Sequence, residues 1–368
     1  MRSHSSGARL ARSSRAFSLK KGSAAPWRAH FGISRGNDFG LLEALGGDVA
    51  GALSLWPEGQ APPVANESGS ASVLSDDELV ELLDTLPKRP LLAGEKGLRL
   101  SLAGAQSKLP VVLVDGRVAL PASGQPTTHI LKPALAHLPA TTENEALVMS
   151  LAVAIELPVA AVEARVVKGR SFLLVTRYDR RFDASGVATR LHQEDFCQAL
   201  GIAPEHKYAE EGGPTFKTCF ELLRRATARP ATEVLKLLDA AIFNTIVGNA
   251  DAHGKNFSLL YDDDVGFAPL YDLLCTVAYT DLSPRFAMKI AKAATLDEIG
   301  ANTWSAFAAD AGLSAPFVRR RIRTLTNAVM GKLPDVVGRV AESGLDGAAL
   351  NGYVALITSR CARLVKTI

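Results

Sequence analysis

The sequence predicts an α+β protein of two lobes, in which a β-rich half precedes a helical half. Short strand-like segments with hairpin turns fill residues 98–176, and segments with helical spacing fill most of the chain after residue 190. A chain of 368 residues can hold two lobes with sizeable cores. We therefore predict a disordered basic extension over 1–37, a β-rich N-lobe over 38–180 and an all-helical C-lobe over 181–368.

Turn and capping signals predict the elements of the N-lobe. Ser75 and Glu78 form a capping box, which predicts that a helix begins before LVELLDTL. Asp-Gly at 115–116 and Lys-Gly at 168–169 each separate two strand-like segments, so two hairpins are expected. The remaining predicted elements are the strands AGALSLW (50–56), LRLSL (98–102) and THILK (128–132), and a helix over 143–156.

The predicted C-lobe is a series of segments with helical spacing, interrupted by one strand, FSLLY. The predicted helices are EDFCQALG (194–201), FKTCFELLRRA (216–226), TEVLKLLDAAIFNTIVG (232–248), TWSAFAADAG (303–312), APFVRRRIRTLTNAVMGKL (315–333) and AALNGYVALITSRCARLV (348–365).

Composition restricts the classes of function. Residues 1–30 carry seven Lys or Arg and no acid; subtracting these from the 41 basic residues leaves 34 against 38 acidic residues, a net charge of −4. The body therefore gives no support for direct nucleic-acid binding. No apolar run reaches about 18 residues, so we expect no membrane span. The four cysteines are far apart and form no CxxC pair, which predicts a reducing, cytoplasmic location.

The segment GNADAHGKNFSLL (248–260) places charged groups between an apolar helix and an apolar strand. Such groups need partners or a ligand. Asp251 and Asn256 have the spacing of a kinase catalytic loop, in which the Asp accepts the substrate hydroxyl's proton and the Asn holds Mg²⁺. Asp272 in PLYDLLC follows the next strand, where a kinase has its metal-binding aspartate. The spacing alone also fits a capped turn.

A nucleotide site needs a lysine and a phosphate-binding loop upstream. Lys132 ends the strand THILK, and the helix behind it carries Glu143 and Glu145, either of which could pair with the lysine. SLAGAQSK (101–108) lies between two predicted strands, and its small residues let a backbone approach phosphate closely. Each feature alone is typical of a solvated strand end or a turn, but their order along the chain favours a kinase-type site.

Seven segments together resemble the HipA family: SLAGAQSKLPVVL, TTHILKP, NEALVMSLA, RYDRRF, HQEDFCQALGIAPEHKY, GNADAHGKNFSLL and PLYDLLC. The family comprises bacterial serine/threonine kinase toxins of type II toxin–antitoxin modules, and the resemblance covers about residues 38–368. It implies a two-lobed protein-kinase-like fold, ATP and Mg²⁺ as cofactors, and growth arrest by phosphorylation of a protein substrate on Ser or Thr. The best-known targets in the family are aminoacyl-tRNA synthetases.

The resemblance also implies roles for single residues. Asp251 is the expected catalytic residue, Asn256 and Asp272 are the expected metal ligands, and Ser101 matches the serine whose autophosphorylation switches the kinase off. Thr176 stands where many members have Glu beside the adenine-contacting hinge. The expected nucleotide-binding residues are Ala103, Gly104, Ala105, Gln106, Lys108, Lys132, the hinge residues Arg177 and Tyr178 through their backbone, and Lys255.

The implied partner is a small helix-turn-helix antitoxin that makes most of the DNA contact. Longer family members have a further β-rich N-terminal segment that helps to contact the antitoxin, and the Ser/Arg-rich stretch here does not resemble it. A truncated chain, a misassigned start or a separate small protein would each account for this difference.

Two other functions are compatible with parts of the pattern. One is a nucleotide-binding corepressor that acts only with a DNA-binding antitoxin, although Lys132, Asp251, Asn256 and Asp272 form a complete catalytic set. The other is a metal-dependent hydrolase using His253, Asp251 and Asp272, which no HxH or HxxxH spacing supports. We expect His253 to order the loop instead.

Overall fold

The computed structural model describes residues 32–34, 37, 39–40, 49–56, 58–59, 70–87 and 107–368. The chain divides into two compact units. Unit 1 contains the described residues up to Ala136 with Arg165–Gln193 and Ala203–Glu205, and unit 2 contains His137–Ala164, Glu194–Ile202 and His206–Ile368. Residues 137–164, which we predicted within the N-lobe, therefore belong to the mainly helical unit.

A six-stranded sheet in the order β1-β3-β2-β4-β6-β5 dominates unit 1. The strands are β1 (Ser72–Val73), β2 (Leu109–Val114), β3 (Arg117–Leu120), β4 (His129–Pro133), β5 (Val162–Val167) and β6 (Arg170–Thr176). Both predicted hairpin turns are confirmed. Residues 115–116 and 168–169 are each two consecutive residues with positive φ, as a two-residue type I′ hairpin turn requires. A separate two-stranded sheet pairs β7 (Arg180–Phe182) with β8 (Ala188–Arg190).

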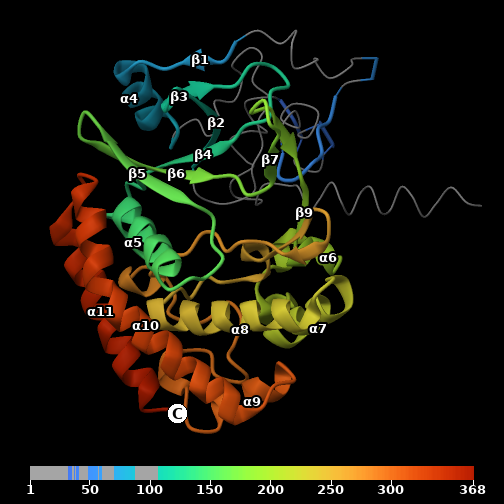
Figure 1. The fold of residues 1–368 in the computed structure, drawn as a ribbon, viewed down its shortest axis with the longest axis vertical. Helices are drawn as coiled ribbons and strands as arrows, with labels where there is room; N and C mark the ends of the chain where they lie inside the picture. The colour runs from blue at the N-terminus through green and yellow to red at the C-terminus, as the bar shows by residue number, and fades with distance from the viewer. Residues whose placement is uncertain are drawn as a thin grey trace, which may run out of the picture. The chain divides into compact units, whose positions relative to one another are not determined.

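One helix, α4 (Asp76–Thr85), completes the core of unit 1. The predicted capping box is confirmed, because Ser75 N donates to Glu78 Oε2 at 2.8 Å and Glu78 N donates to Ser75 Oγ at 3.3 Å. Leucines at 79, 82, 83 and 86 come from successive turns and pack on the apolar face of the sheet, beside which Figure 1 shows the helix.

Unit 2 is built mainly from helices: α5 (Thr141–Ala154), α6 (Phe196–Ala199), α7 (Phe216–Ala226), α8 (Pro230–Val247), α9 (Thr303–Asp310), α10 (Ala315–Glu342) and α11 (Gly347–Val365). The C-lobe predicted over 181–368 is not all-helical, although the predicted strand FSLLY is present as β10. A three-stranded sheet in the order β11-β10-β9 joins Val265–Phe267, Ser258–Tyr261 and His192–Asp195. The predicted helix 194–201 begins only at Phe196, because Asp195 is extended and caps it through Gln198 N at 2.9 Å.

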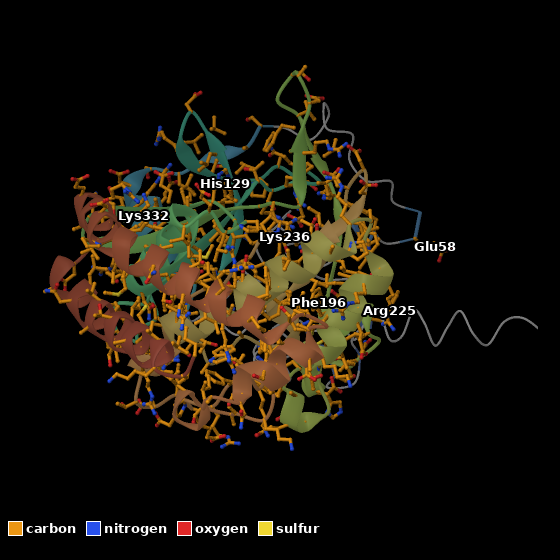
Figure 2. All side chains as sticks on the ribbon, turned by 60° about the horizontal axis from the view of Figure 1, so that its bottom comes forward. Glu58, His129, Phe196, Arg225, Lys236 and Lys332 are labelled. Carbon is orange, nitrogen blue, oxygen red and sulfur yellow. The ribbon has the colours of Figure 1, made fainter. Side chains whose placement is uncertain are left out.

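Aromatic rings form much of the interior of unit 2. Phe216 meets Phe307 edge to face at 5.4 Å between ring centroids, and Phe196 lies 5.9 Å from Phe257. In Figure 2, Phe196 lies among interior side chains, whereas the exposed Arg225 extends outward. Phe257 follows Asn256 directly, so this core anchors one end of the loop 248–256.

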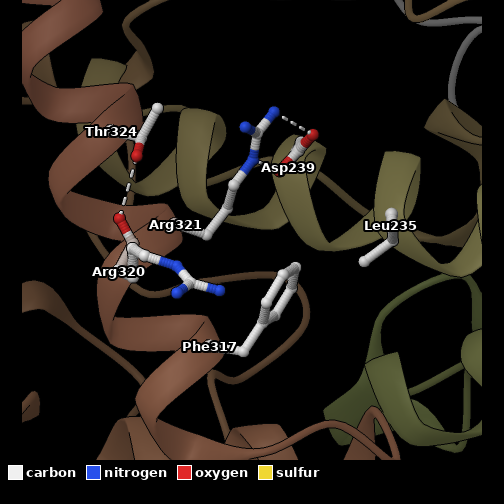
Figure 3. Close-up of a pocket in the computed structure, with 6 residues that line it drawn as sticks. All are labelled: Leu235, Asp239, Phe317, Arg320, Arg321 and Thr324. Atoms are coloured by element: carbon white, nitrogen blue, oxygen red, sulfur yellow. Dashed lines mark hydrogen bonds and ion pairs between the residues drawn. The ribbon is translucent and has the colours of Figure 1, made fainter.

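Helices α8 and α10 are joined by a bidentate ion pair. Arg321 Nε and Nη2 donate to the two carboxylate oxygens of Asp239 at 2.6 and 2.7 Å. Beside this pair lies an open pocket of about 300 Å³, in which Arg320 lies 5.6 Å from the ring of Phe317 (Figure 3). The ion pair fixes α8, the helix from which the loop 248–256 emerges. Within the described residues, no helix is both long and apolar enough to cross a bilayer.

Candidate active site

Helix α8 ends where the loop of Asp251 begins. Gly248 has φ +77°, and a Cβ there would lie 2.5 Å from Val277 Cγ2, so the glycine permits both the turn and the close approach. Its carbonyl accepts from Val277 N at 3.1 Å, and Ala250 N donates to Thr276 Oγ1 at 2.7 Å. The start of the loop is therefore fixed to residues 276–277.

Internal hydrogen bonds hold the loop from Asp251 to Asn256. His253 N donates to Asp251 O at 2.8 Å, and Asn256 N donates to His253 O at 2.9 Å, which forms a short 3₁₀ turn over Gly254–Asn256. The side chain of Asp251 is 51% exposed, whereas that of His253 is 9% exposed. The loop thus presents the carboxylate to solvent and buries the imidazole.

The segment of Asp272 is tied to the same loop. Tyr271 Oη donates to Lys255 O at 2.9 Å and also contacts Ser258 Oγ at 2.7 Å. Asp272 itself has φ +54°, an uncommon conformation that asparagine and aspartate tolerate better than most residues. Its carbonyl accepts from Asn249 Nδ2 at 3.4 Å. Residues flanking Asp272 and Asn256 are therefore held side by side within unit 2.

The donor atoms of this region suit a magnesium ion. Asn256 and Asp272 supply amide and carboxylate oxygens, the ligand type that Mg²⁺ prefers. Asn249 Oδ1 is a further buried oxygen, and it has no hydrogen-bond partner among the described residues. Such an acceptor calls for a water or an ion. The chemistry of these donors is compatible with the expected metal, and its binding by Asn256 and Asp272 remains a prediction.

Helix α5 supports the segment after Asp272. Asn144, which is fully buried, accepts from Cys275 N at 2.7 Å and donates to Cys275 O at 3.0 Å. A side-chain amide that satisfies both backbone groups of one residue fixes that residue in space. We did not predict this role for Asn144, which lies 131 residues from its partner in sequence.

Three further side chains surround Asp251: Tyr208, Lys207 and His253, of which only His253 had a predicted role. Tyr208 Oη donates to Asp251 Oδ1 at 3.0 Å. Lys207, only 5% exposed, contacts His253 Nε2 and lies 4.4 Å from the centroid of the Tyr208 ring. Burial and the negative charge of Asp251 raise the pKa of Tyr208, so this phenol stays protonated and remains a hydrogen-bond donor. Both residues lie in the segment HQEDFCQALGIAPEHKY, which was part of the family resemblance.

Lys255, expected to bind nucleotide, has a protein partner. Its Nζ lies 2.5 Å from Asp195 Oδ2, and both side chains are largely buried, at 13% and 12% exposed. Asp195 also caps α6, so this pair joins the loop to the start of that helix. The structure therefore supports an anchoring role for Lys255, and nucleotide binding by this residue remains a prediction.

Lys132 lies in β4, opposite Leu173 of β6, and is 4% exposed. An ammonium group buried to this extent needs anionic or strongly polar neighbours. Glu143 and Glu145 are also buried, at 6% and 3% exposed, and lie in unit 2. Lys108 is half-buried just before β2. Their proposed roles remain predictions.

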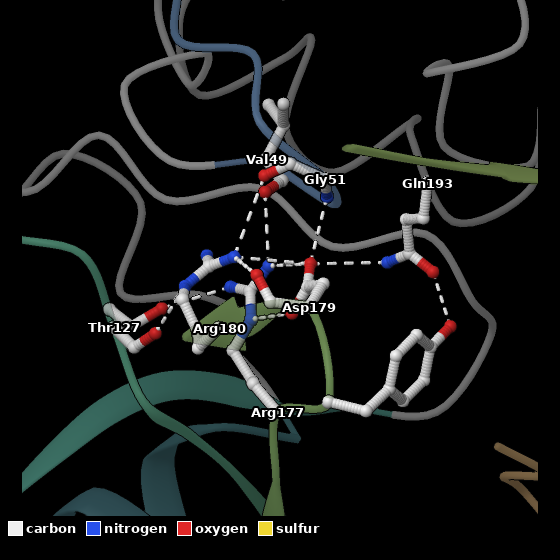
Figure 4. Close-up of polar contacts among 8 residues, drawn as sticks. Val49, Gly51, Thr127, Arg177, Asp179, Arg180 and Gln193 are labelled. Carbon is white, nitrogen blue, oxygen red and sulfur yellow. Dashed lines mark hydrogen bonds and ion pairs between the residues drawn. The ribbon is translucent and has the colours of Figure 1, made fainter. Parts of the chain in front are cut away.

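The hinge expected at Arg177 and Tyr178 contains a buried charge network (Figure 4). Arg177 Nη2 donates to Asp179 Oδ2 at 2.8 Å and to Val49 O at 3.1 Å, and Gly51 N donates to the same carboxylate oxygen at 2.8 Å. Arg177 N donates to Thr128 O at 2.9 Å, so this amide is already used by the sheet. An adenine contact through Arg177 would therefore use its carbonyl.

The same network corrects the prediction of a strand over 50–56, where the structure has no strand. Backbone groups of Val49 and Gly51 bond to the side chains of Arg177 and Asp179 in place of a neighbouring strand. The expected phosphate loop residues Ala103, Gly104, Ala105 and Gln106, and Ser101 with them, lie outside the described residues.

Comparisons with known proteins agree with the resemblance. A family model described as the HipA-like C-terminal domain matches residues 100–333. The putative kinase Y4mE of Sinorhizobium fredii is 60% identical over 338 residues, covering 91% of this chain and 80% of that protein. The serine/threonine-protein kinase toxin HipA of Shewanella oneidensis is 28% identical over 346 residues, covering 90% and 78%.

A solved structure is similar over almost the whole chain. It is the Shewanella oneidensis MR-1 toxin–antitoxin complex of HipA, HipB and operator DNA, which matches with a TM-score of 0.82 at 26% identity. The match covers 97% of this chain and 88% of that chain.

Proposed function

The chain belongs to the HipA family, and from this membership we propose that it is an ATP- and Mg²⁺-dependent protein serine/threonine kinase acting as a growth-arresting toxin. The observation that carries the proposal is the loop of Asp251. This half-exposed acid precedes Asn256 by the kinase spacing, on a loop hydrogen-bonded through Tyr271 to the segment of Asp272. The proposed substrate is a protein with a Ser or Thr acceptor, and an aminoacyl-tRNA synthetase is one candidate.

In the proposed reaction, Asp251 orients the acceptor hydroxyl and accepts its proton. The hydroxyl oxygen forms a bond to the γ-phosphorus of ATP, the bond from that phosphorus to the β–γ bridging oxygen breaks, and ADP leaves with the electron pair. Asn256 and Asp272 would hold Mg²⁺, which supplies neutralisation of the phosphate charge when bound. Lys132 would bind the phosphates of the nucleotide, and orientation by these residues would supply much of the rate.

We also propose that autophosphorylation of Ser101 switches the kinase off. A phosphoryl group there would bring a charge of about −1.5 to −2 to the edge of the loop 101–108. It would compete with the phosphates of ATP for the backbone amides of Ala103, Gly104 and Ala105, and for Lys132. The expected result is loss of nucleotide binding.

The proposed protein partner is a small helix-turn-helix antitoxin. Support comes from the related Shewanella structure, which contains HipB and operator DNA together with HipA. The acidic balance of this chain after residue 30 favours DNA contact mainly through the partner. The proposed location is a reducing cytoplasm, in which the four buried free cysteines would remain thiols.

Phosphoryl transfer can be tested without knowledge of the substrate. Wild-type protein incubated with radiolabelled ATP and Mg²⁺ should label itself, and mass spectrometry should find the phosphate on Ser101. Asp251→Asn should reduce labelling by orders of magnitude while thermal unfolding stays unchanged. Asp264→Asn, an exposed acid in the β10–β11 turn, serves as the control and should label normally.

Two outcomes would contradict the proposal. Near-wild-type labelling by Asp251→Asn would remove that residue from the catalytic role. A wild-type protein that binds ATP without transferring phosphate, and represses transcription only with its antitoxin, would favour the corepressor function.

A further inference from the structure

Tyr208 contacts the carboxylate of Asp251 although 43 residues separate them in sequence. Asp251 lies at the exposed edge of its loop, and its side chain must adopt one orientation before it can accept a proton from a substrate. The hydrogen bond from Tyr208 Oη to Asp251 Oδ1, at 3.0 Å, restricts that orientation. A donor that stays protonated at neutral pH suits this purpose.

The ring of Tyr208 is itself held from several sides. It packs edge to face on His253, with ring centroids 5.4 Å apart, and Lys207 lies over its face. The backbone of Tyr208 is equally fixed, because its carbonyl accepts from Gly213 N at 2.9 Å. A Cβ on Gly213 would lie 2.6 Å from that carbonyl oxygen, so the contact is close. The phenol is thus presented from a rigid support.

The two carboxylate oxygens of Asp251 have different surroundings. Oδ1 accepts from Tyr208, whereas Oδ2 lies 3.9 Å from His253 Nε2, which is too far for a hydrogen bond. Tyr208 therefore occupies Oδ1, and Oδ2 is the oxygen suited to receive a proton.

We propose that Tyr208 is a positioning residue for the phosphoryl-transfer reaction: it fixes Asp251 through Oδ1 so that Oδ2 accepts the proton of the substrate hydroxyl, while Lys207 and His253 hold the tyrosine in place. The inference rests on the proposed kinase function. Tyr208 acts through Asp251 and touches neither nucleotide nor substrate in this role.

The test compares two substitutions that each remove one phenol oxygen. Tyr208→Phe keeps the ring and its packing but loses the hydrogen bond to Asp251. Tyr261→Phe is the matched control, because Tyr261 in β10 makes a phenol–carboxylate hydrogen bond to Glu194 in the same unit. For each protein, the self-phosphorylation rate is measured against ATP concentration, ATP·Mg affinity by calorimetry, and stability by thermal unfolding.

Tyr208→Phe should lower the rate at saturating ATP by about 10- to 100-fold, the loss expected for a hydrogen bond to a charged group. The ATP concentration for half-maximal rate, the ATP·Mg affinity and the melting temperature should stay close to wild type. Tyr261→Phe should leave the rate within about twofold of wild type. This separation of rate from affinity distinguishes positioning from a structural role.

Three results would overturn the inference while leaving the kinase function intact. They are a Tyr208→Phe rate within twofold of wild type, an equal fall in Tyr261→Phe, or a parallel loss of ATP affinity in Tyr208→Phe. A wild-type protein that transfers no phosphate would overturn the proposed function, and the role of Tyr208 with it.

Discussion

Asp179 is the carboxylate on which the buried charge network of unit 1 depends, so Asp179→Asn should strongly destabilise that unit. The carboxylate accepts from Arg177 Nη2 and Gly51 N, each at 2.8 Å, and lies 3.1 Å from Arg180 Nη1. Asparagine preserves the shape of the side chain but leaves two buried guanidinium groups without this negative charge. Removing one partner of a buried ion pair costs about 3–5 kcal/mol, and we expect the free energy of unfolding to fall by that amount.

The lowered pKa of Asp179 predicts a second effect, a dependence of the unfolding free energy on pH. Burial alone would raise the pKa of Asp179, but the charge and hydrogen bonds of Arg177, with the charge of Arg180, lower it from 3.8 to about 2. A lowered pKa in the folded state stabilises the protein above the unfolded pKa, and this contribution is lost as the pH falls from about 4 toward 2. At about 1.4 kcal/mol per tenfold change in proton affinity, the contribution is about 2 to 3 kcal/mol.

Urea denaturation of wild type and Asp179→Asn at pH 7 measures the destabilisation. Urea denaturation of both proteins at several pH values between 4 and 2 measures the pH dependence. Hydrogen exchange of residues 49–56 reports whether the segment bound to Asp179 opens. The control is Asp84→Asn, which removes an ion pair with Arg170 in the same unit. Both partners there are 52% exposed, so solvent screening should leave stability almost unchanged.

A free energy of unfolding for Asp179→Asn within about 1 kcal/mol of wild type would contradict this prediction, since a buried unpaired charge costs more than that. An acid dependence identical to that of wild type would refute the pKa assignment, because the variant lacks the group that titrates there.

Two further predictions concern Asp272 and the loop of Asp251. Asp272→Asn should weaken Mg²⁺-dependent ATP binding more than Asp251→Asn does, because Asp272 would ligate the ion while Asp251 faces the substrate; equal affinities in calorimetric titration would contradict this. Gly254→Ala should lower the unfolding free energy by about 1–3 kcal/mol through overpacking, because its Cβ would lie 2.5 Å from Pro214 Cγ and 2.9 Å from Cys197 Sγ. Gly266→Ala, with nothing within 4 Å, should melt near the wild-type temperature, and equal melting temperatures for the two variants would refute the packing argument.

Local signals predicted local structure well. The hairpin turns at 115–116 and 168–169 and the capping box of Ser75 depend on residues within three or four positions of one another, and all are present. Helix α7 has the predicted bounds, 216–226, because its apolar residues recur with helical spacing. The loop carrying Asp251 and Asn256 was likewise singled out from spacing within one short segment, and the catalytic roles of these residues remain predictions.

Features that depend on distant partners could not be predicted from the sequence. The segment 50–56 has strand-like composition, yet its backbone bonds to side chains about 128 residues away. Glu194 and Asp195 were taken for the start of a helix because the strand that pairs with β9 lies some 65 residues further on. Tyr208 lies in a recognised motif, but its contact with Asp251 required the fold. Periodicity and turn chemistry carry no information on such pairings.

Helix α5 has a consequence for how the protein is made. Eleven of its 14 residues are buried, and it packs within unit 2 against α10 and α11, which are synthesised much later. The hydroxyl of Tyr353 in α11 donates to Ala140 O at the start of α5, across a separation of 213 residues. At 5–20 residues per second, a ribosome needs about 10 to 40 s to cover that distance. During that interval α5 emerges without its packing partners, so the nascent chain should need chaperone protection until α11 has left the exit tunnel.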